Sequence, residues 1–168
     1  DILETQITSL REAVKLSGVE PGEIAAVGIT NQRETTFLWD RKTGECVGNA
    51  IVWQCRRTSQ IVDDLVSRGC SDMIREKTGL VPDAYFSGTK LKWMLDYYNV
   101  RDRAERGELC FGTADSFLCW NLLENRPHVT DATNAGRTMM FNLHTQDWDD
   151  DLLALLDIPR GCLPQVGD

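Results

Sequence analysis

The sequence of 168 residues has few histidines, and its cysteines are not arranged as metal-binding pairs. His128 and His144 are the only histidines, and none of the six cysteines belongs to a C-x-x-C pair. Structural zinc sites are usually built from such closely spaced Cys and His ligands. A zinc site is therefore not expected, and we interpret the cysteines as reduced thiols of a cytoplasmic protein.

Long apolar runs and an excess of positive charge are also missing. No run approaches the roughly 18 consecutive apolar residues of a membrane span, and the first residues lack the pattern of a signal peptide. Lys and Arg number 18 against 26 Asp and Glu, which gives a net charge of −8. Neither a membrane span nor a nucleic-acid partner is expected from this sequence.

The common glycine-rich nucleotide loops are absent as well. Neither G-x-x-x-x-G-K-[ST] nor G-x-G-x-x-G occurs, although these loops hold phosphates in many nucleotide-binding proteins. His128 and His144 lie outside any recognisable nucleophile motif, so both are interpreted as surface or capping residues. The residues alone thus assign neither a nucleotide site nor a catalytic nucleophile.

The hydrophobic pattern alternates between helical and strand-like segments along the whole chain. Apolar residues at helical spacing predict a helix that ends near Gly18, and the apolar run 24–29 predicts a buried strand. Residues 35–39 and 50–53 are expected to be hairpin-like neighbours in a sheet. The absence of repeats or long linkers favours a single domain over residues 1–168. Further helices are expected around 61–69, 73–77, 87–95, 101–106, 116–123 and 149–156, with Ser87 as an N-cap, further strands at 109–112, 128–130 and 138–142, and a loop at 164–168.

One stretch of polar residues interrupts the strand pattern. The segment Gly-Ile-Thr-Asn-Gln-Arg-Glu-Thr-Thr at 28–36 places Arg33 and Glu34 directly after a buried-type strand. An arginine supplies donors and an ionised glutamate supplies acceptors, and a hydroxyl group needs both. Neighbouring strand residues point to opposite faces, so both side chains reach one ligand only if the backbone turns there. The pair suits a polyol, whereas a dipeptide of this kind taken alone is more often a solvated pair on a hairpin.

Four segments together resemble the glycerol kinases of the FGGY carbohydrate kinase family. They are 28–36, Asn-Ala-Ile-Val-Trp-Gln-Cys-Arg-Arg-Thr at 49–58, Gly-Leu-Val-Pro-Asp-Ala-Tyr-Phe-Ser-Gly-Thr-Lys at 79–90 and Val-Thr-Asp-Ala-Thr-Asn-Ala-Gly-Arg-Thr at 129–138. The resemblance covers essentially the whole chain. The segments around the Arg-Glu pair and Trp-Gln-x-Arg-Arg distinguish this group from the xylulose and gluconate kinases.

The resemblance implies an actin-like, ribonuclease-H-like α/β fold in two large domains, with glycerol and Mg²⁺-ATP bound between them. This chain then corresponds to most of the N-terminal domain, as one partial domain over 1–168. The phosphate-binding hairpin, the general-base aspartate and the adenine-binding C-terminal domain are expected outside it, so no catalytic residue is assigned here. Asp83, Asp115 and Asp131 belong to segments that the family has in addition to its base, and we interpret them as paired or capping carboxylates.

The resemblance also implies a set of substrate-binding residues. Arg33 and Glu34 match the pair that hydrogen-bonds the glycerol hydroxyls, Tyr85 matches a phenol ligand, and Trp53 matches a ring that packs on the carbon backbone. Buried polar groups provide most of the discrimination for so small a triol. Taken alone, Trp53 and Tyr85 would be read as ordinary core aromatics.

The favoured hypothesis is the glycerol-binding part of an ATP-dependent glycerol kinase, inactive as an isolated chain. The resemblance implies that the complete enzyme is a homo-oligomer that needs ATP and Mg²⁺. Two alternatives stay open. One is a kinase for another polyol or a ketose, and the other is a short non-catalytic relative that binds glycerol or a partner protein.

Overall fold

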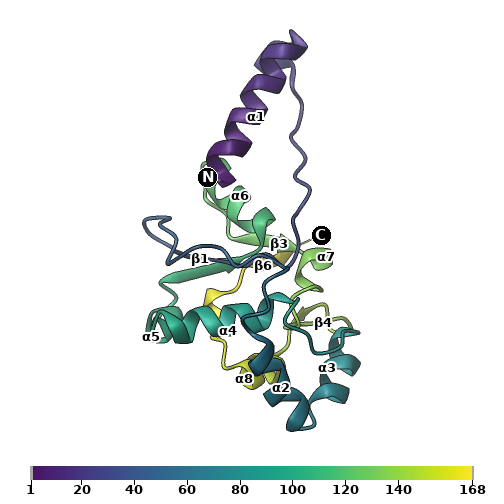
Figure 1. Ribbon diagram of the computed structural model, residues 1–168. Helices are drawn as coiled ribbons and strands as arrows, with labels where there is room; N and C mark the ends of the chain where they lie inside the picture. Colours follow the sequence, from purple (N-terminus) through teal and green to yellow (C-terminus); the bar gives the residue numbers. More distant parts are fainter. Residues whose placement is uncertain (1, 168) are drawn as a thin grey trace. The chain divides into compact units, whose positions relative to one another are not determined.

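The computed structural model describes residues 2–167. The chain divides into two compact units, one up to Thr30 and one from Asn31 onward. The mixture of helices and strands predicted from the sequence is confirmed, since the second unit contains both along its whole length (Figure 1).

The first unit consists of one long helix, a short 3-10 turn and an extended segment. Helix α1 (Ile2–Ser17) agrees with the prediction, and Gly18 follows it with a positive φ of 71°. The 3-10 helix η1 spans Pro21–Glu23. The predicted buried strand at 24–29 is wrong, because this run forms no strand and Val27 is 61% exposed. A strand forms only where another strand pairs with it, and no described segment pairs with this one.

The second unit contains a buried pair of antiparallel strands near its centre. Strand β1 (Phe37–Asp40) pairs with β2 (Leu109–Gly112). On its other side, single bridges join Thr36 to Ile51 and Trp39 to Cys46, so the predicted hairpin-like neighbour is present only as bridges. Residues 36–39 and all of β2 are buried, which explains their continuous rather than alternating apolar pattern.

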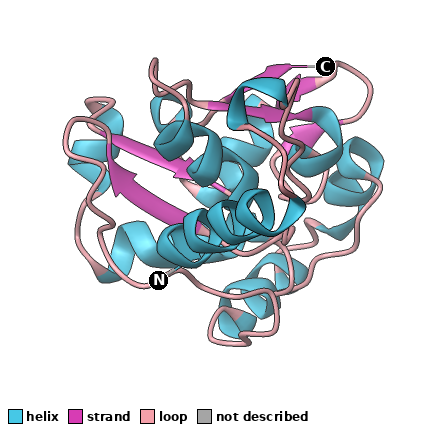
Figure 2. Cartoon of the chain, turned by 90° about the horizontal axis from the view of Figure 1, so that it is seen from above, coloured by secondary structure: helices cyan, strands magenta, loops and turns pink. Residues whose placement is uncertain are grey.

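Two further strand pairs are short. Strand β3 (Val129–Asp131) runs parallel to β6 (Gln165–Gly167), whereas β4 (Phe141–Asn142) is antiparallel to β5 (Asp147–Trp148). The predicted loop at 164–168 is therefore wrong for residues 165–167. The strand predicted at 138–142 shortens to two residues, because Met139 has a φ of 63° that no strand accommodates. Figure 2 shows the strands as magenta arrows among the helices, and the described strands pair two by two as β1 with β2, β3 with β6 and β4 with β5.

The predicted helices of the second unit are confirmed, with boundaries shifted by a few residues. Ser87 is not the predicted N-cap, since Phe86 holds that position and the Ser87 hydroxyl donates to the Glu34 carbonyl oxygen at 3.2 Å. The helices are α2 (Ser59–Ser67), α3 (Ser71–Thr78), α4 (Ser87–Tyr97), α5 (Arg101–Glu105), α6 (Ala114–Leu122), α7 (Ala132–Ala135), α8 (Asp150–Leu156) and the 3-10 helix η2 (Arg160–Cys162).

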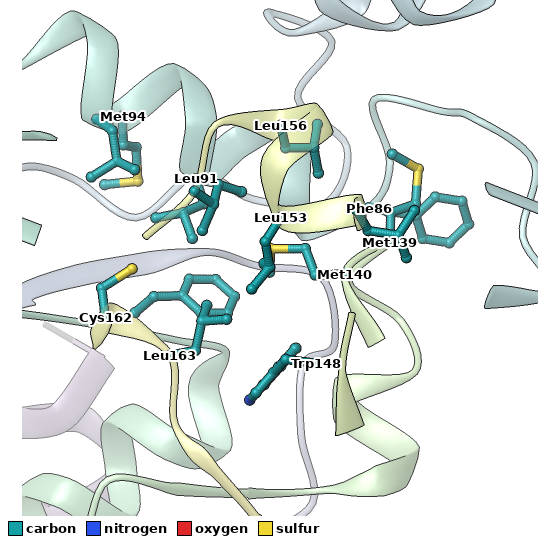
Figure 3. Close-up of a cluster of buried hydrophobic side chains, with 14 of the residues drawn as sticks. Phe86, Leu91, Met94, Met139, Met140, Trp148, Leu153, Leu156, Cys162 and Leu163 are labelled. Carbon is teal, nitrogen blue, oxygen red and sulfur yellow. The ribbon is translucent and has the colours of Figure 1, made fainter. Parts of the chain in front are cut away.

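The hydrophobic core gathers side chains from segments far apart in the sequence. Leu91 and Met94 of α4 are completely buried, and Leu153 and Leu156 of α8 belong to the same cluster (Figure 3). Met140, just before β4, adds a flexible thioether that fills irregular space. This core holds α4 in place and therefore also the segment that enters it, residues 84–86.

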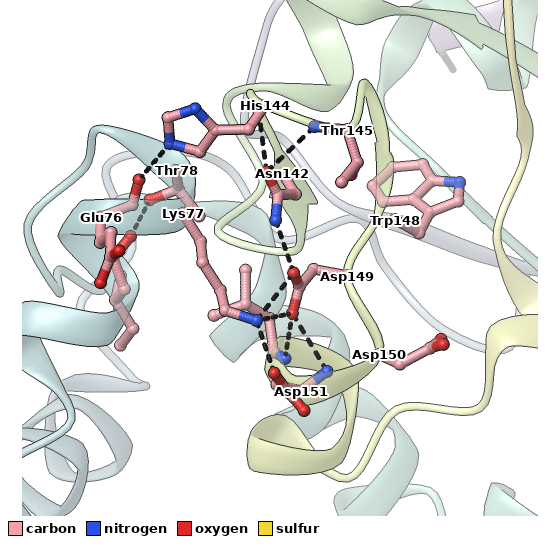
Figure 4. A network of polar contacts seen from close by, with 12 residues as sticks. Glu76, Lys77, Thr78, Asn142, His144, Thr145, Trp148, Asp149, Asp150 and Asp151 are labelled. Carbon is pink, nitrogen blue, oxygen red and sulfur yellow. Dashed lines mark hydrogen bonds and ion pairs between the residues drawn. The ribbon is translucent and has the colours of Figure 1, made fainter.

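A polar network joins α3 to the start of α8. The Lys77 ammonium group donates to both Asp149 oxygens at 2.8 and 2.9 Å and to Asp151 at 2.6 Å (Figure 4). Asp149 is also the N-cap of α8, and Asn142 donates to it at 2.7 Å. Partial burial opposes its ionisation, but the hydrogen bonds from Lys77 and Asn142 hold the pKa of Asp149 below its usual value.

The two histidines differ in environment. His128 is partly buried, with Nε2 2.7 Å from the Phe111 carbonyl oxygen and its ring edge-on to Trp39. Burial lowers its pKa to about 4. His144 is exposed and lies 2.9 Å from the Glu76 carbonyl oxygen. The surface interpretation is therefore confirmed for His144 and wrong for His128.

Candidate functional site

Glu34 lies at a turn immediately before the central strand. Residues 33 and 34 form this turn, and Glu34 has a positive φ of 64°. Such a backbone conformation is uncommon for a residue with a side chain, and it tends to occur at functional sites. The Glu34 side chain is only 3% exposed. The backbone thus turns at residues 33 and 34. This turn is the condition under which the side chains of Arg33 and Glu34 can reach one ligand.

Arg137 pairs with the buried Glu34 carboxylate. Its Nε donates to Glu34 Oε1 at 2.8 Å, and its side chain is 32% exposed. A buried carboxylate needs such a charged partner. Among the described residues, no donor reaches the second oxygen, Oε2. One acceptor atom of Glu34 is therefore held by the protein and the other is available to a ligand.

Aromatic rings adjoin the same arginine. The Arg137 guanidinium lies 4.9 Å from the Phe86 ring centre and 5.9 Å from that of Tyr85. Tyr85 in turn meets Trp53 edge-to-face with ring centres 5.6 Å apart. Arg137 thus connects three of the residues singled out by sequence, Glu34, Tyr85 and Trp53, which come from three separate segments.

Trp53 and Tyr85 differ in burial, because Trp53 lies outside the core whereas Tyr85 packs against it. Trp53 is 37% exposed, and Tyr85 is partly buried. Within the described part of the chain, the Tyr85 phenol oxygen has no hydrogen-bond partner. An exposed indole face and an unpaired phenol are suited to a ligand with both carbon and hydroxyl groups.

Arg33 differs from the other three residues. It is exposed, and no contact with another described side chain joins it to Glu34, Tyr85 or Trp53. Its place in the site depends on its position next to Glu34 in the turn. Its role in binding stays a prediction.

The backbone of Tyr85 is held from its N-terminal side by an aspartate. Asp83 Oδ1 accepts from the Tyr85 backbone N–H at 2.7 Å and from Arg56 at 2.5 Å. Burial opposes ionisation, but these two donors keep the pKa of Asp83 below its usual value. Asp83 therefore shapes the turn that presents Tyr85.

The other two aspartates considered as bases lie in a second polar cluster. Asp115 accepts from Thr113 through one oxygen, and from Thr130 at 2.7 Å and Asn134 at 3.3 Å through the other. Asp131 is the N-cap of α7. Asn31 bridges this cluster by donating to Thr113 and Asn134, both at 2.9 Å. Both Asp115 oxygens are thus engaged by protein groups.

Metal-binding clusters and membrane-spanning helices are both absent from the described residues. Residues 2–167 contain no group of three or more His, Cys, Asp or Glu that could hold a metal ion. Within the same range, no helix is long and apolar enough to cross a membrane.

The whole chain, residues 1–168, matches the model of the FGGY family of carbohydrate kinases, N-terminal domain. The chain belongs to this family. Its FGGY relatives include glycerol kinase 2 of Thermotoga maritima, 59% identical over 99% of this chain and 34% of the relative. The chain therefore spans about a third of the length of the curated relatives it matches.

Solved FGGY structures share the fold. Glycerol kinase of Plasmodium falciparum with ADP superimposes with a TM-score of 0.81 at 33% identity, over 85% of this chain and 28% of that one. A ligand-bound xylulose kinase from Lactobacillus acidophilus also gives 0.81, at 25% identity, over 99% of this chain and 33% of that one. These likenesses agree with the α/β N-terminal domain expected from the sequence.

Sequence reasoning did not assign Arg137 a role. The segment Asn-Ala-Gly-Arg-Thr that contains it was recognised as part of the family pattern, but its partner Glu34 lies 103 positions away. The signal that could have identified Arg137 was its charge. A glutamate that follows a buried strand needs a cationic partner, and the recognised segment 129–138 contains an arginine.

Proposed function

We propose that this chain is the glycerol-binding part of an ATP-dependent glycerol kinase, which converts glycerol and ATP to sn-glycerol 3-phosphate and ADP. The relatives at 57–59% identity are named glycerol kinases, but the chain covers only about a third of each. The proposal therefore assigns acceptor binding to this chain and phosphoryl transfer to the complete enzyme.

The observation that carries the proposal is the chain of contacts from Glu34 through Arg137 to Tyr85 and Trp53. In the proposed complex, Glu34 Oε2 accepts a hydrogen bond from a glycerol hydroxyl, and the Tyr85 phenol donates to or accepts from another. Arg33 adds donors from the same turn, and Trp53 packs on the carbon atoms. When a substrate lacks a hydroxyl at the matching position, these polar groups are left without partners. The free-energy cost of the unpaired groups disfavours that substrate relative to glycerol.

The chemistry of transfer requires groups that the described residues do not supply. Triphosphate and its Mg²⁺ need backbone donors and metal ligands, and the acceptor hydroxyl needs a carboxylate base. No metal-binding cluster is present among residues 2–167, and Asp83, Asp115 and Asp131 are engaged by other protein groups. We therefore assign the binding of ATP and Mg²⁺ to the C-terminal domain and the phosphate-binding hairpin of the complete enzyme.

The proposal also covers the cellular location and the assembly of the enzyme. The six cysteines are free thiols, which supports a cytoplasmic location. We also propose, from the family resemblance, that the complete enzyme is a homo-oligomer.

The test is an acceptor panel with the full-length kinase. ADP release would be coupled to NADH oxidation, with Mg²⁺-ATP fixed and glycerol, D-xylulose or gluconate varied. We expect kcat/KM to be highest for glycerol by at least about tenfold, the scale of one hydrogen bond lost or left unpaired. A higher kcat/KM for D-xylulose or gluconate would replace the proposal with a ketose or sugar-acid kinase.

A further inference from the structure

Lys90 of α4 is a completely buried lysine with an unusual set of partners. Its exposed fraction is 0%, although lysines are rarely fully buried. Its ammonium group donates to the carbonyl oxygens of Ala84 at 2.9 Å, of Tyr85, and of Phe86 at 3.2 Å. The three donor hydrogens of the lysine thus match three consecutive carbonyls.

These carbonyls belong to the segment that leads into α4, so Lys90 folds back over the start of its own helix. A positive charge is disfavoured at a helix N-terminus and in a buried position. Burial lowers the pKa of Lys90 to about 8, while the negative charges of Glu34, Cys55 and Asp83 oppose this effect and Arg56 reinforces it. A residue held at such an electrostatic cost is a candidate for a functional role.

The held segment contains one of the proposed glycerol ligands. Tyr85 is the middle residue of the three, and its ring lies between Trp53 and Arg137. The Tyr85 N–H is held by Asp83 at 2.7 Å, and its carbonyl by Lys90. The backbone N–H and the carbonyl oxygen of Tyr85 are therefore both held by buried or partly buried charged groups. The backbone conformation in turn restricts the rotamers, and hence the direction, of the Tyr85 side chain.

We propose that Lys90 is a positioning residue for acceptor binding, which holds the backbone of residues 84–86 so that the Tyr85 phenol meets a glycerol hydroxyl. The inference rests on the proposed function. Lys90 acts through Tyr85 and does not itself touch glycerol.

The first test compares the steady-state kinetics of two full-length variants, Lys90→Met and Lys77→Met, with the wild type. Lys90→Met keeps the length of the side chain and removes its charge and donors. We expect KM for glycerol to rise at least about tenfold, as for a lost hydrogen bond to a charged group, with KM for Mg²⁺-ATP changed less than about twofold. Lys77→Met is the matched control, because Lys77 holds Asp149 in another network and should leave KM for glycerol unchanged.

A double variant distinguishes positioning from general destabilisation. If Lys90 acts through Tyr85, Lys90→Met adds little to the effect of Tyr85→Ala, and the two KM changes are not additive. Full additivity, or an unchanged KM for glycerol in Lys90→Met, would overturn the inference while leaving the proposed function intact. A wild type without glycerol-dependent ADP release would overturn both.

Lys90→Gln is the second variant if Lys90→Met does not fold, because its amide still donates hydrogen bonds without the charge. The same rise in KM for glycerol is expected, at smaller size. Failure of both variants to fold would make Lys90 a purely structural residue and would overturn the proposal.

Discussion

At the scale of single residues, burial and charge decide which polar side chains have a structural role and which remain available. Glu34 is buried with one oxygen paired to Arg137, and Asp115 has both oxygens bonded to neighbours. The sequence indicated Glu34 by its place after a strand. The structure adds Arg137, whose positive charge offsets the free-energy cost of burying the Glu34 carboxylate. Ser87 shows the limit of such reasoning, since a typical N-cap residue donates instead to the Glu34 carbonyl.

His128 gives a prediction about pH at this scale. Burial lowers the folded-state pKa of His128 from the ordinary value of 6.5 to about 4. The unfolded chain therefore binds a proton between these values while the folded chain does not, so stability falls as pH decreases from about 6.5 towards 4. Between pH 7 and 5 the loss should be about 1–2 kcal/mol, reduced by the partial exposure of the ring.

The measurement is denaturant unfolding at pH 7 and pH 5 for the wild type and His128→Gln. We expect the wild type to lose more stability than the variant by the amount given above. Equal losses in the two proteins would show that His128 is protonated without cost in the folded state.

At the scale of elements, short polar junctions hold helices that are separated in sequence. Lys77 of α3 binds the N-cap carboxylate of α8, and its ammonium pKa is raised by its hydrogen bonds to Asp149 and Asp151. Lys77→Met should lower the free energy of unfolding by about 1–3 kcal/mol, because Asp149 then remains as a partly buried charge without its main cation. Lys42→Met, at an exposed lysine, is the control and should change stability little.

Urea unfolding of both variants at neutral pH checks this prediction. The difference should shrink as pH falls below about 4, since the pKa of Asp149 is lowered in the folded state and its contribution is lost on protonation. A Lys77→Met variant as stable as Lys42→Met would contradict the account of this junction.

The helices of the second unit could be predicted because each carries its own apolar face, as in Leu91, Met94 and Leu95 of α4. Strands were harder, because pairing depends on distant segments. Residues 165–167 form β6 because they pair with β3, which lies 36 positions earlier in the sequence, and no local sequence pattern indicates this pairing. Conversely, the apolar run 24–29 has a strand-like sequence but no described partner and forms no strand.

At the scale of the whole molecule, the chain contains a fold and one side of a proposed site. It belongs to the FGGY family and spans about a third of its curated relatives. Of the four residues singled out by sequence, contacts connect Glu34, Tyr85 and Trp53, while Arg33 is exposed beside them. The sequence predicts these residues by type and motif, but the contacts of Arg137 with Glu34 and Tyr85, and of Tyr85 with Trp53, depend on tertiary packing.

The most direct test of the central claim is the glycerol dependence of the full-length kinase with Arg33→Ala, Glu34→Gln or the exposed control Glu45→Gln. The account predicts that kcat/KM for glycerol falls roughly 10- to 150-fold in each of the first two variants, which corresponds to about 1.5–3 kcal/mol for a hydrogen bond to a charged group. Glu45→Gln should match the wild type. A kcat/KM for glycerol that is unchanged in both Arg33→Ala and Glu34→Gln would contradict the assignment of the acceptor site to this turn.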